Sequence, residues 1–262
     1  MEAEELREQL DKAELVLVGL GEEFDAACRL QSVQEFQRGR EFLQGKGALW
    51  LLPAWSEYCA ERKEMSVESL LGKLKSLLEG RNYFVVSVST NSAISSGLGG
   101  EKKLVMPCGG VLDKQCEKCC EGALSSVTER DFGVLEEFFE QLWSGRFTWE
   151  KTPELGRCGH CGGPMILNNI YAGSYDERGY HEAWNVYTKW LQGTLNRRLL
   201  LLELGVSMGF PSVVRLPFEK ITRYNQKAFL YRVNEKLYQL PEDILSKGYG
   251  ISKNAIDWLG QL

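Results

Sequence analysis

The chain has 262 residues, of which 44% are hydrophobic and 26% charged, and its formal net charge is −5. A chain of this length can bury a full core, and its acidic balance argues against nucleic acid or an anionic membrane as the main partner. No apolar run approaches the roughly 18 residues of a membrane span, and the charged N-terminus lacks the apolar segment of a signal peptide. We therefore expect a cytoplasmic protein without a membrane anchor.

Short apolar runs predict the strands of a sheet. The first, LVLVG, ends in a glycine turn, and so does the run RLLLLELG. The expected strands span residues 15–19, 82–90, 102–107, 198–205, 212–218 and 228–234. Helical periodicity is found at residues 67–78, 128–143, 181–195 and 251–259. Apolar strands that alternate with helices predict an α/β fold, with a parallel sheet covered by helices on both faces.

The spacing of the cysteines gives the strongest chemical signal. Cys116 and Cys119 form one C-x-x-C pair, and Cys158 and Cys161 form a second. Two such pairs in a reducing compartment predict a structural zinc site, because each turn brings two thiolates to one tetrahedral ion. Unrelated thiol pairs or a redox dithiol are the alternatives.

Two residues beside these cysteines qualify the ligand set. Cys120 offers another partner for Cys116 in the first pair. His160 lies inside the second pair, and we expect it to be solvated rather than to bind the metal.

The residues between the two cysteine pairs predict the domain organisation. They include the expected helix 128–143, so the zinc would hold an inserted module rather than a minimal ribbon. We expect this module to span residues 111–164, between the parts 1–110 and 165–262 of a large domain. The segment 32–62 is expected to be helical and to cap the sheet.

Several stretches, taken together, resemble the sirtuin family and within it the bacterial branch. They are the glycine turn after the first strand, the cysteine module, CGHCGGPMILNN at 158–169, GYHEAWNVYTKWL at 179–191 and LLLLELGVSMGFPSVVRLPF at 199–218. The resemblance covers about 14–258. It implies a Rossmann-like large domain, a small zinc domain and a cleft between them for NAD and an acyl-lysine or protein substrate.

The same resemblance assigns residues to the nucleotide. It places Gly19 and Gly21 at the phosphate loop, and Gly205, Ser207 and Asn234 on the adenosine side. These positions imply that NAD or ADP-ribose is a possible, weakly bound cofactor. Gly205 is also explained as an ordinary turn residue.

Glu22 and Glu23 follow the phosphate-loop glycines and stand where a phosphate would bind. Carboxylates at this place gain from the helix dipole and repel a phosphate. We expect the two glutamates to cap the following helix and thereby fill the anion site.

The groups that carry out sirtuin chemistry are not found at their expected positions. The family motif T-N-x-D falls on Val88 and Thr90 in one alignment, or on Asn91 and Ala93 in another, and neither contains the acid. The catalytic His falls on Cys108, or on the following glycine, and both histidines of the chain lie elsewhere.

Two functions follow from this pattern. The first is a sirtuin fold with a degenerate site, catalytically impaired or inactive, that binds a nucleotide remnant or a protein partner. The second is an NAD-dependent deacylase or mono-ADP-ribosyltransferase. A redox or zinc-sensing role for Cys108 and Cys120 is a third.

Overall fold

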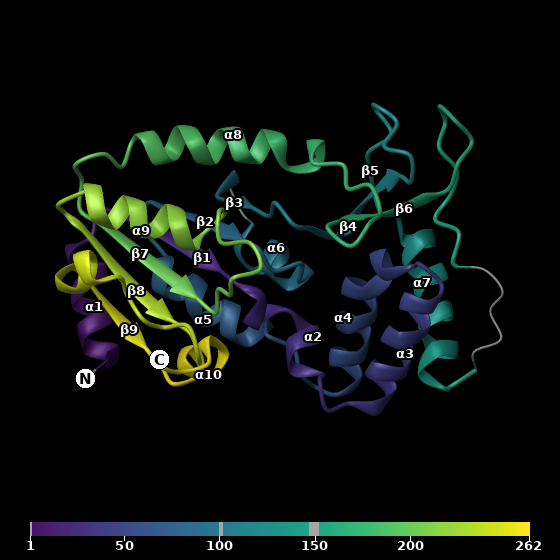
Figure 1. Ribbon diagram of the computed structural model, residues 1–262, viewed down its shortest axis with the longest axis horizontal. Helices are drawn as coiled ribbons and strands as arrows, with labels where there is room; N and C mark the ends of the chain where they lie inside the picture. Colours follow the sequence, from purple (N-terminus) through teal and green to yellow (C-terminus); the bar gives the residue numbers. More distant parts are fainter. Residues whose placement is uncertain (1, 100–101, 147–151) are drawn as a thin grey trace.

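A six-stranded parallel sheet forms the larger part of the protein, as seen in a computed structural model that describes residues 2–99, 102–146 and 152–262 (Figure 1). The strand order is β3-β2-β1-β7-β8-β9, and all the pairs are parallel. In this order the strands span Leu104–Val105, Tyr83–Ser87, Leu15–Leu20, Leu199–Leu204, Ala228–Val233 and Gly248–Ile251. The predicted α/β fold is confirmed.

Helices cover both faces of this sheet, which explains why its central strands are mostly apolar. On β1, Leu15 and Leu17 pack towards one face, and Val16 and Val18 towards the other. Helices α8 and α9 cover the first face (Figure 1). Helices α1, α5, α6 and α10 cover the second. Helices α8 and α9 span Arg178–Gln192 and Arg215–Tyr224. Helices α1, α5, α6 and α10 span Glu2–Lys12, Glu68–Leu78, Ser92–Leu98 and Ala255–Gly260.

Two predicted elements of the C-terminal part are wrong. Residues 212–218 were expected to form a strand, but α9 begins at Arg215. Pro217 lies in its first turn, where a missing N–H costs nothing. Residues 251–259 were expected to form one helix, but β9 ends at Ile251 and Asn254 caps α10 through the backbone N–H of Ile256.

A second core lies beside the sheet and contains the cysteine module. It combines a small antiparallel sheet in the order β5-β4-β6 with helices α2, α3, α4 and α7 (Figure 1). These strands span Ser125–Ser126, Gly109–Cys116 and Met165–Asn169, and these helices span Ala26–Arg29, Gln34–Gly45, Leu52–Arg62 and Glu129–Trp143. Helix α7 matches the predicted helix 128–143, and Thr128 and Asp131 form its capping box.

The segment 32–62 is helical, as expected, but it does not cap the parallel sheet. Its buried residues, including Phe36 and Trp55, pack with Phe139 of α7 in the second core. The large helix α7 offers an apolar face that the short strands of the small sheet cannot cover alone. The boundaries proposed at residues 110 and 165 stay a prediction.

Candidate functional site

Four cysteine sulfurs gather at one end of the small sheet, where they could hold a metal ion. They belong to Cys116, Cys120, Cys158 and Cys161, and all lie within 4.8 Å of one another. Backbone N–H groups point at three of them, with a donor distance of 3.4 Å to the Sγ atoms of Cys116, Cys158 and Cys161. Four thiolates that converge in this way match the tetrahedral set that structural zinc prefers, so the residues fit the ion.

Cys119 does not belong to this set, so the ligand assigned from the C-x-x-C spacing is wrong at that position. The Cys119 residue adopts a left-handed backbone with φ of 52°, and its thiol donates to the carbonyl of Ser174 at 3.0 Å. Cys120 takes the fourth place instead. His160 is outside the group of sulfurs, and only its backbone N–H contacts one of them, on Cys158.

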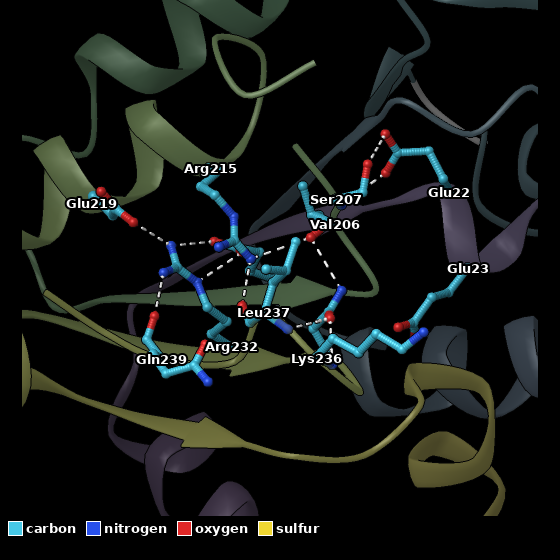
Figure 2. Close-up of polar contacts among 12 residues, drawn as sticks. Glu22, Glu23, Val206, Ser207, Arg215, Glu219, Arg232, Lys236, Leu237 and Gln239 are labelled. Carbon is cyan, nitrogen blue, oxygen red and sulfur yellow. Dashed lines mark hydrogen bonds and ion pairs between the residues drawn. The ribbon is translucent and has the colours of Figure 1, made fainter. Parts of the chain in front are cut away.

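The side chain of Glu22 bonds to Ser207 in the loop after β7, as Figure 2 shows. Its Oε2 accepts the backbone N–H of Ser207 at 2.9 Å, and its Oε1 accepts the Ser207 hydroxyl at 2.6 Å. An N–H and a hydroxyl side by side are the donors that a phosphate oxygen would use. The Glu22 carboxylate therefore occupies two donors that the oxygen of a bound anion could otherwise use.

Glu23 reaches two further loops at the same edge of the sheet. Its Oε1 accepts the N–H of Glu235 at 3.3 Å, and its Oε2 accepts the N–H of Ala255 at 2.6 Å. Burial raises the pKa of the Glu23 carboxyl above its ordinary value. The expectation that Glu22 and Glu23 cap their own helix is wrong, because both carboxylates bond across to other loops.

The glycines of the first loop have a packing role in this structure. The N–H of Gly21 donates to the carbonyl of Leu204, and the N–H of Gly205 donates to that of Val233, both at 2.8 Å. A Cβ on Gly21 would lie 2.1 Å from the Gly205 oxygen, and one on Gly19 would lie 2.3 Å from Val214 of the loop before α9. Glycine is required at these positions because neighbouring segments lie too close for a Cβ atom.

We expect Gly21→Ala to destabilise the protein by about 2 kcal/mol, because the added methyl would force two backbone segments apart. Gly72→Ala is the matched control, since its Cβ would meet nothing within 4 Å on the surface of α5, and alanine favours a helix. Urea unfolding of both variants measures the difference. Equal stability of Gly21→Ala and wild type would contradict this contact.

Asn234 lies at the end of β8, and its side chain is engaged within the protein. Its Oδ1 accepts the N–H groups of Lys236 and Leu237 at 2.9 and 2.7 Å, and its Nδ2 donates to the carbonyl of Val206 at 3.1 Å. The amide oxygen thus has both lone pairs in use, and one N–H remains for any ligand. Asn234 shapes the two loops on the predicted adenosine side.

A buried ion network contacts the same loops (Figure 2). Glu203 of β7 pairs with Arg232 of β8 at 2.8 Å and with Arg215 of α9 at 3.1 Å, and Arg232 also pairs with Glu219. Arg232 donates to the carbonyl of Gln239, and Arg215 donates to those of Val206 and Leu237. Sequence reasoning missed this network, although Glu203 and Arg232 interrupt apolar strands at paired positions.

The loop after β2 contains no acidic residue, in agreement with both alignments. Val88 is buried in the core, and Asn91 caps α6 while its Nδ2 donates to the carbonyl of Phe24 at 2.9 Å. The loop is held by the buried carboxylate of Asp25, which accepts the N–H of Thr90 at 2.8 Å. Burial raises the pKa of Asp25 to about 6.

Cys108 is buried at the position where the resemblance places a histidine. Its side chain is 2% exposed, and burial raises the pKa of its thiol to about 12. At neutral pH the thiol stays protonated, so it cannot accept a proton as a base. The next residue, Gly109, has a positive φ of 66° and no side chain that could replace it.

Comparison with known proteins identifies the class of fold. Solved structures of sirtuins cover the whole chain: Sir2Tm bound to a propionylated peptide has a TM-score of 0.61 at 15% identity, with 97% of that chain covered. A Sir2 complex with a p53 peptide and NAD+ has a TM-score of 0.56 at 16% identity, again over 100% of this chain and 97% of that one. The protein therefore has a sirtuin-like fold with a four-cysteine cluster.

One curated relative adds a name to this class. The chain is 24% identical over 262 residues to a "Protein ADP-ribosyltransferase" of Staphylococcus aureus (strain Mu50 / ATCC 700699), which covers 93% of this chain and 81% of that protein. No family model matches the chain. Within residues 2–99, 102–146 and 152–262, the helices lack the length and hydrophobicity that a membrane-spanning helix requires.

Proposed function

We propose that this protein is a non-catalytic member of the sirtuin fold that acts in the cytoplasm by binding, either to a protein partner or to a nucleotide remnant such as ADP-ribose. The observation that carries the proposal is the pair of bonds from Ser207 to the Glu22 carboxylate. An enzyme that used NAD would need these donors for a phosphate and would need a base near Cys108. Glu22 fills the first position, and the protonated thiol of Cys108 does not serve in the second.

The second candidate is an NAD-dependent transferase, either a deacylase or a mono-ADP-ribosyltransferase. The name of the Staphylococcus aureus relative favours it, as do the sirtuin structures that contain NAD+ or a propionylated peptide. In that case Glu22 and Glu23 would have to leave the Ser207 and Glu235 loops when NAD binds. The two candidates differ in a single measurable step, the release of nicotinamide.

We expect the purified protein to release no nicotinamide from NAD above background, with or without an acyl-lysine peptide, because the thiol of Cys108, at the position of the family's catalytic histidine, stays protonated. An active sirtuin assayed in parallel is the control. Turnover on the order of 1 s⁻¹ would overturn the proposal. If such turnover survived Cys108→Ala, the base would lie elsewhere in the chain.

A further inference from the structure

A large cavity lies between the second core and the loop that follows β2. It has a volume of about 800 Å³ and is lined by α2, α4, α7 and the first residues of α5 and α6. Its walls are apolar where α7 contributes Phe132, Leu135 and Phe139. Phe132 is 42% exposed, which is unusual for an aromatic ring that has a core beside it. None of the lining residues belongs to the loops that Glu22 and Glu23 contact.

The charged groups that line this cavity are mostly acidic. Four carboxylates and two guanidinium groups face it: Glu57, Glu61, Glu68, Glu136, Arg29 and Arg62. Both guanidinium groups are already engaged. Arg29 donates to backbone carbonyls, including those of Phe24 and Met65, and Arg62 pairs with Glu140 outside the cavity.

Glu57 is the least exposed of these carboxylates, and both of its oxygens accept hydrogen bonds from Ser92. Its Oε1 accepts the backbone N–H of Ser92 at 2.8 Å, and its Oε2 accepts the Ser92 hydroxyl at 2.5 Å. Each oxygen has a second lone pair available for a ligand. No lysine or arginine of the described chain pairs with it, and burial, together with the charge of Asp25, raises the pKa of Glu57 to about 7. A cation from outside would relieve this unfavourable burial.

We propose that this cavity binds an ammonium or guanidinium group carried on an aliphatic chain, and that Glu57 is the carboxylate that receives it. The apolar wall of Phe132, Leu135 and Phe139 would cover the methylene groups, as happens when long basic side chains bury their stems. Glu61, Glu68 and Glu136 at the rim would attract the cation electrostatically. The inference is independent of the proposed function, since cation binding and nicotinamide release are measured separately.

Calorimetric titration with cadaverine, with n-butylguanidinium and with a blocked tripeptide that has a central lysine tests the proposal on the intact protein. We expect each probe to bind wild type, and Glu57→Gln to bind at least about tenfold more weakly, because the charge is lost while the contact with Ser92 can be kept. If the peptide binds more tightly than cadaverine, the natural ligand is a basic side chain of a protein segment. If cadaverine binds more tightly than the peptide, the natural ligand is a free polyamine.

Neighbouring residues of α7 provide a matched pair of variants. Glu136→Gln removes a carboxylate that lines the cavity, and Glu137→Gln removes an exposed one that does not. The first should weaken binding by about two- to fivefold, as for exposed charges, and the second should leave it unchanged. This pair keeps the test valid if Glu57→Gln fails to fold.

The pH dependence gives an independent measurement. Amines and guanidinium groups stay charged near neutral pH, whereas Glu57 loses its proton as the pH rises through about 7. The groups that face it are Asp25, Arg29, Glu61, Arg62, Glu68 and Glu136. Wild-type affinity should therefore rise severalfold from about pH 6 to pH 8, and the rise should be lost in Glu57→Gln. Equal affinity of wild type and Glu57→Gln, or no binding at about 10 mM of any probe, would overturn the proposal.

Discussion

The double variant Glu22→Ala/Glu23→Ser should bind ADP-ribose about ten- to a few hundredfold more tightly than wild type. The two substitutions free the donors on Ser207, Glu235 and the first residue of α10, and they remove two negative charges that would lie beside a diphosphate. Each charge costs about 1–4 kcal/mol at 4 Å, depending on screening, and tenfold in affinity is about 1.4 kcal/mol. Catalysis should not return, because Cys108 still cannot act as a base.

Titration calorimetry at low and high salt measures this change, and the gain should be smaller at high salt. Glu235→Ala/Asp257→Ala is the control, since it removes two nearby carboxylates whose charges act on Glu23, while the bonds of Glu22 and Glu23 to their loops stay in place. If the control variant gained as much affinity for ADP-ribose as the test variant, the gain would be due to the lower negative charge of the region and not to the freed donors. Tight binding by wild type would show that Glu22 and Glu23 leave their loops readily.

The largest loss of stability is expected when one cysteine of the four-sulfur cluster is replaced. Cys120→Ser should lower the zinc content from about one ion per chain to near zero, because three thiolates cannot complete the tetrahedron. Part of the binding free energy of a structural zinc ion is folding free energy. We therefore expect a loss of at least about 3 kcal/mol, which corresponds to a fall of about 6–12 °C in the unfolding midpoint.

Cys119→Ser is the matched control for this experiment. The residue is adjacent in sequence, but its thiol bonds to Ser174 instead of facing the other sulfurs. The variant should keep its zinc and most of its stability. Loss of metal from Cys119→Ser together with retention in Cys120→Ser would restore the C-x-x-C pairing that the spacing suggests. Metal analysis and thermal unfolding of both variants decide between the two pairings.

Periodicity and burial account for the parts of the fold that could be predicted. The strand LVLVG and the helix that Thr128 caps have strong patterns, because the strand is buried on both faces and the helix has a single apolar stripe. The run SVVRLPF was mistaken for a strand because β-branched residues favour strands locally. In the fold, Val214 lies against Gly19 and Phe218 is buried in the core. A helix that begins at Arg215 places both side chains in these positions.

The errors at the candidate sites have a different origin, since they depend on contacts between distant segments. The C-x-x-C spacing favoured Cys119 and left Cys120 as the alternative. In the structure the sulfur of Cys120 joins the cluster, and Cys119 has a left-handed backbone and bonds to Ser174 instead. Glu22 was expected to cap its own helix, but its carboxylate bonds to Ser207, which is far along the chain. Glu57 could not be found from the sequence, because nothing near it in the chain indicates that Ser92 will be its neighbour.

The strand order has a consequence for how quickly the protein can fold. Strands β1, β2 and β3 precede the cysteine module in the chain, strands β7, β8 and β9 follow it, and the two halves meet where Leu15 pairs with Leu199. Closing this seam brings together segments separated by most of the chain, and pairings of such long range are intrinsically slow to form. The kinetic bottleneck of assembly is therefore expected at the centre of the sheet, although that is its most deeply buried part.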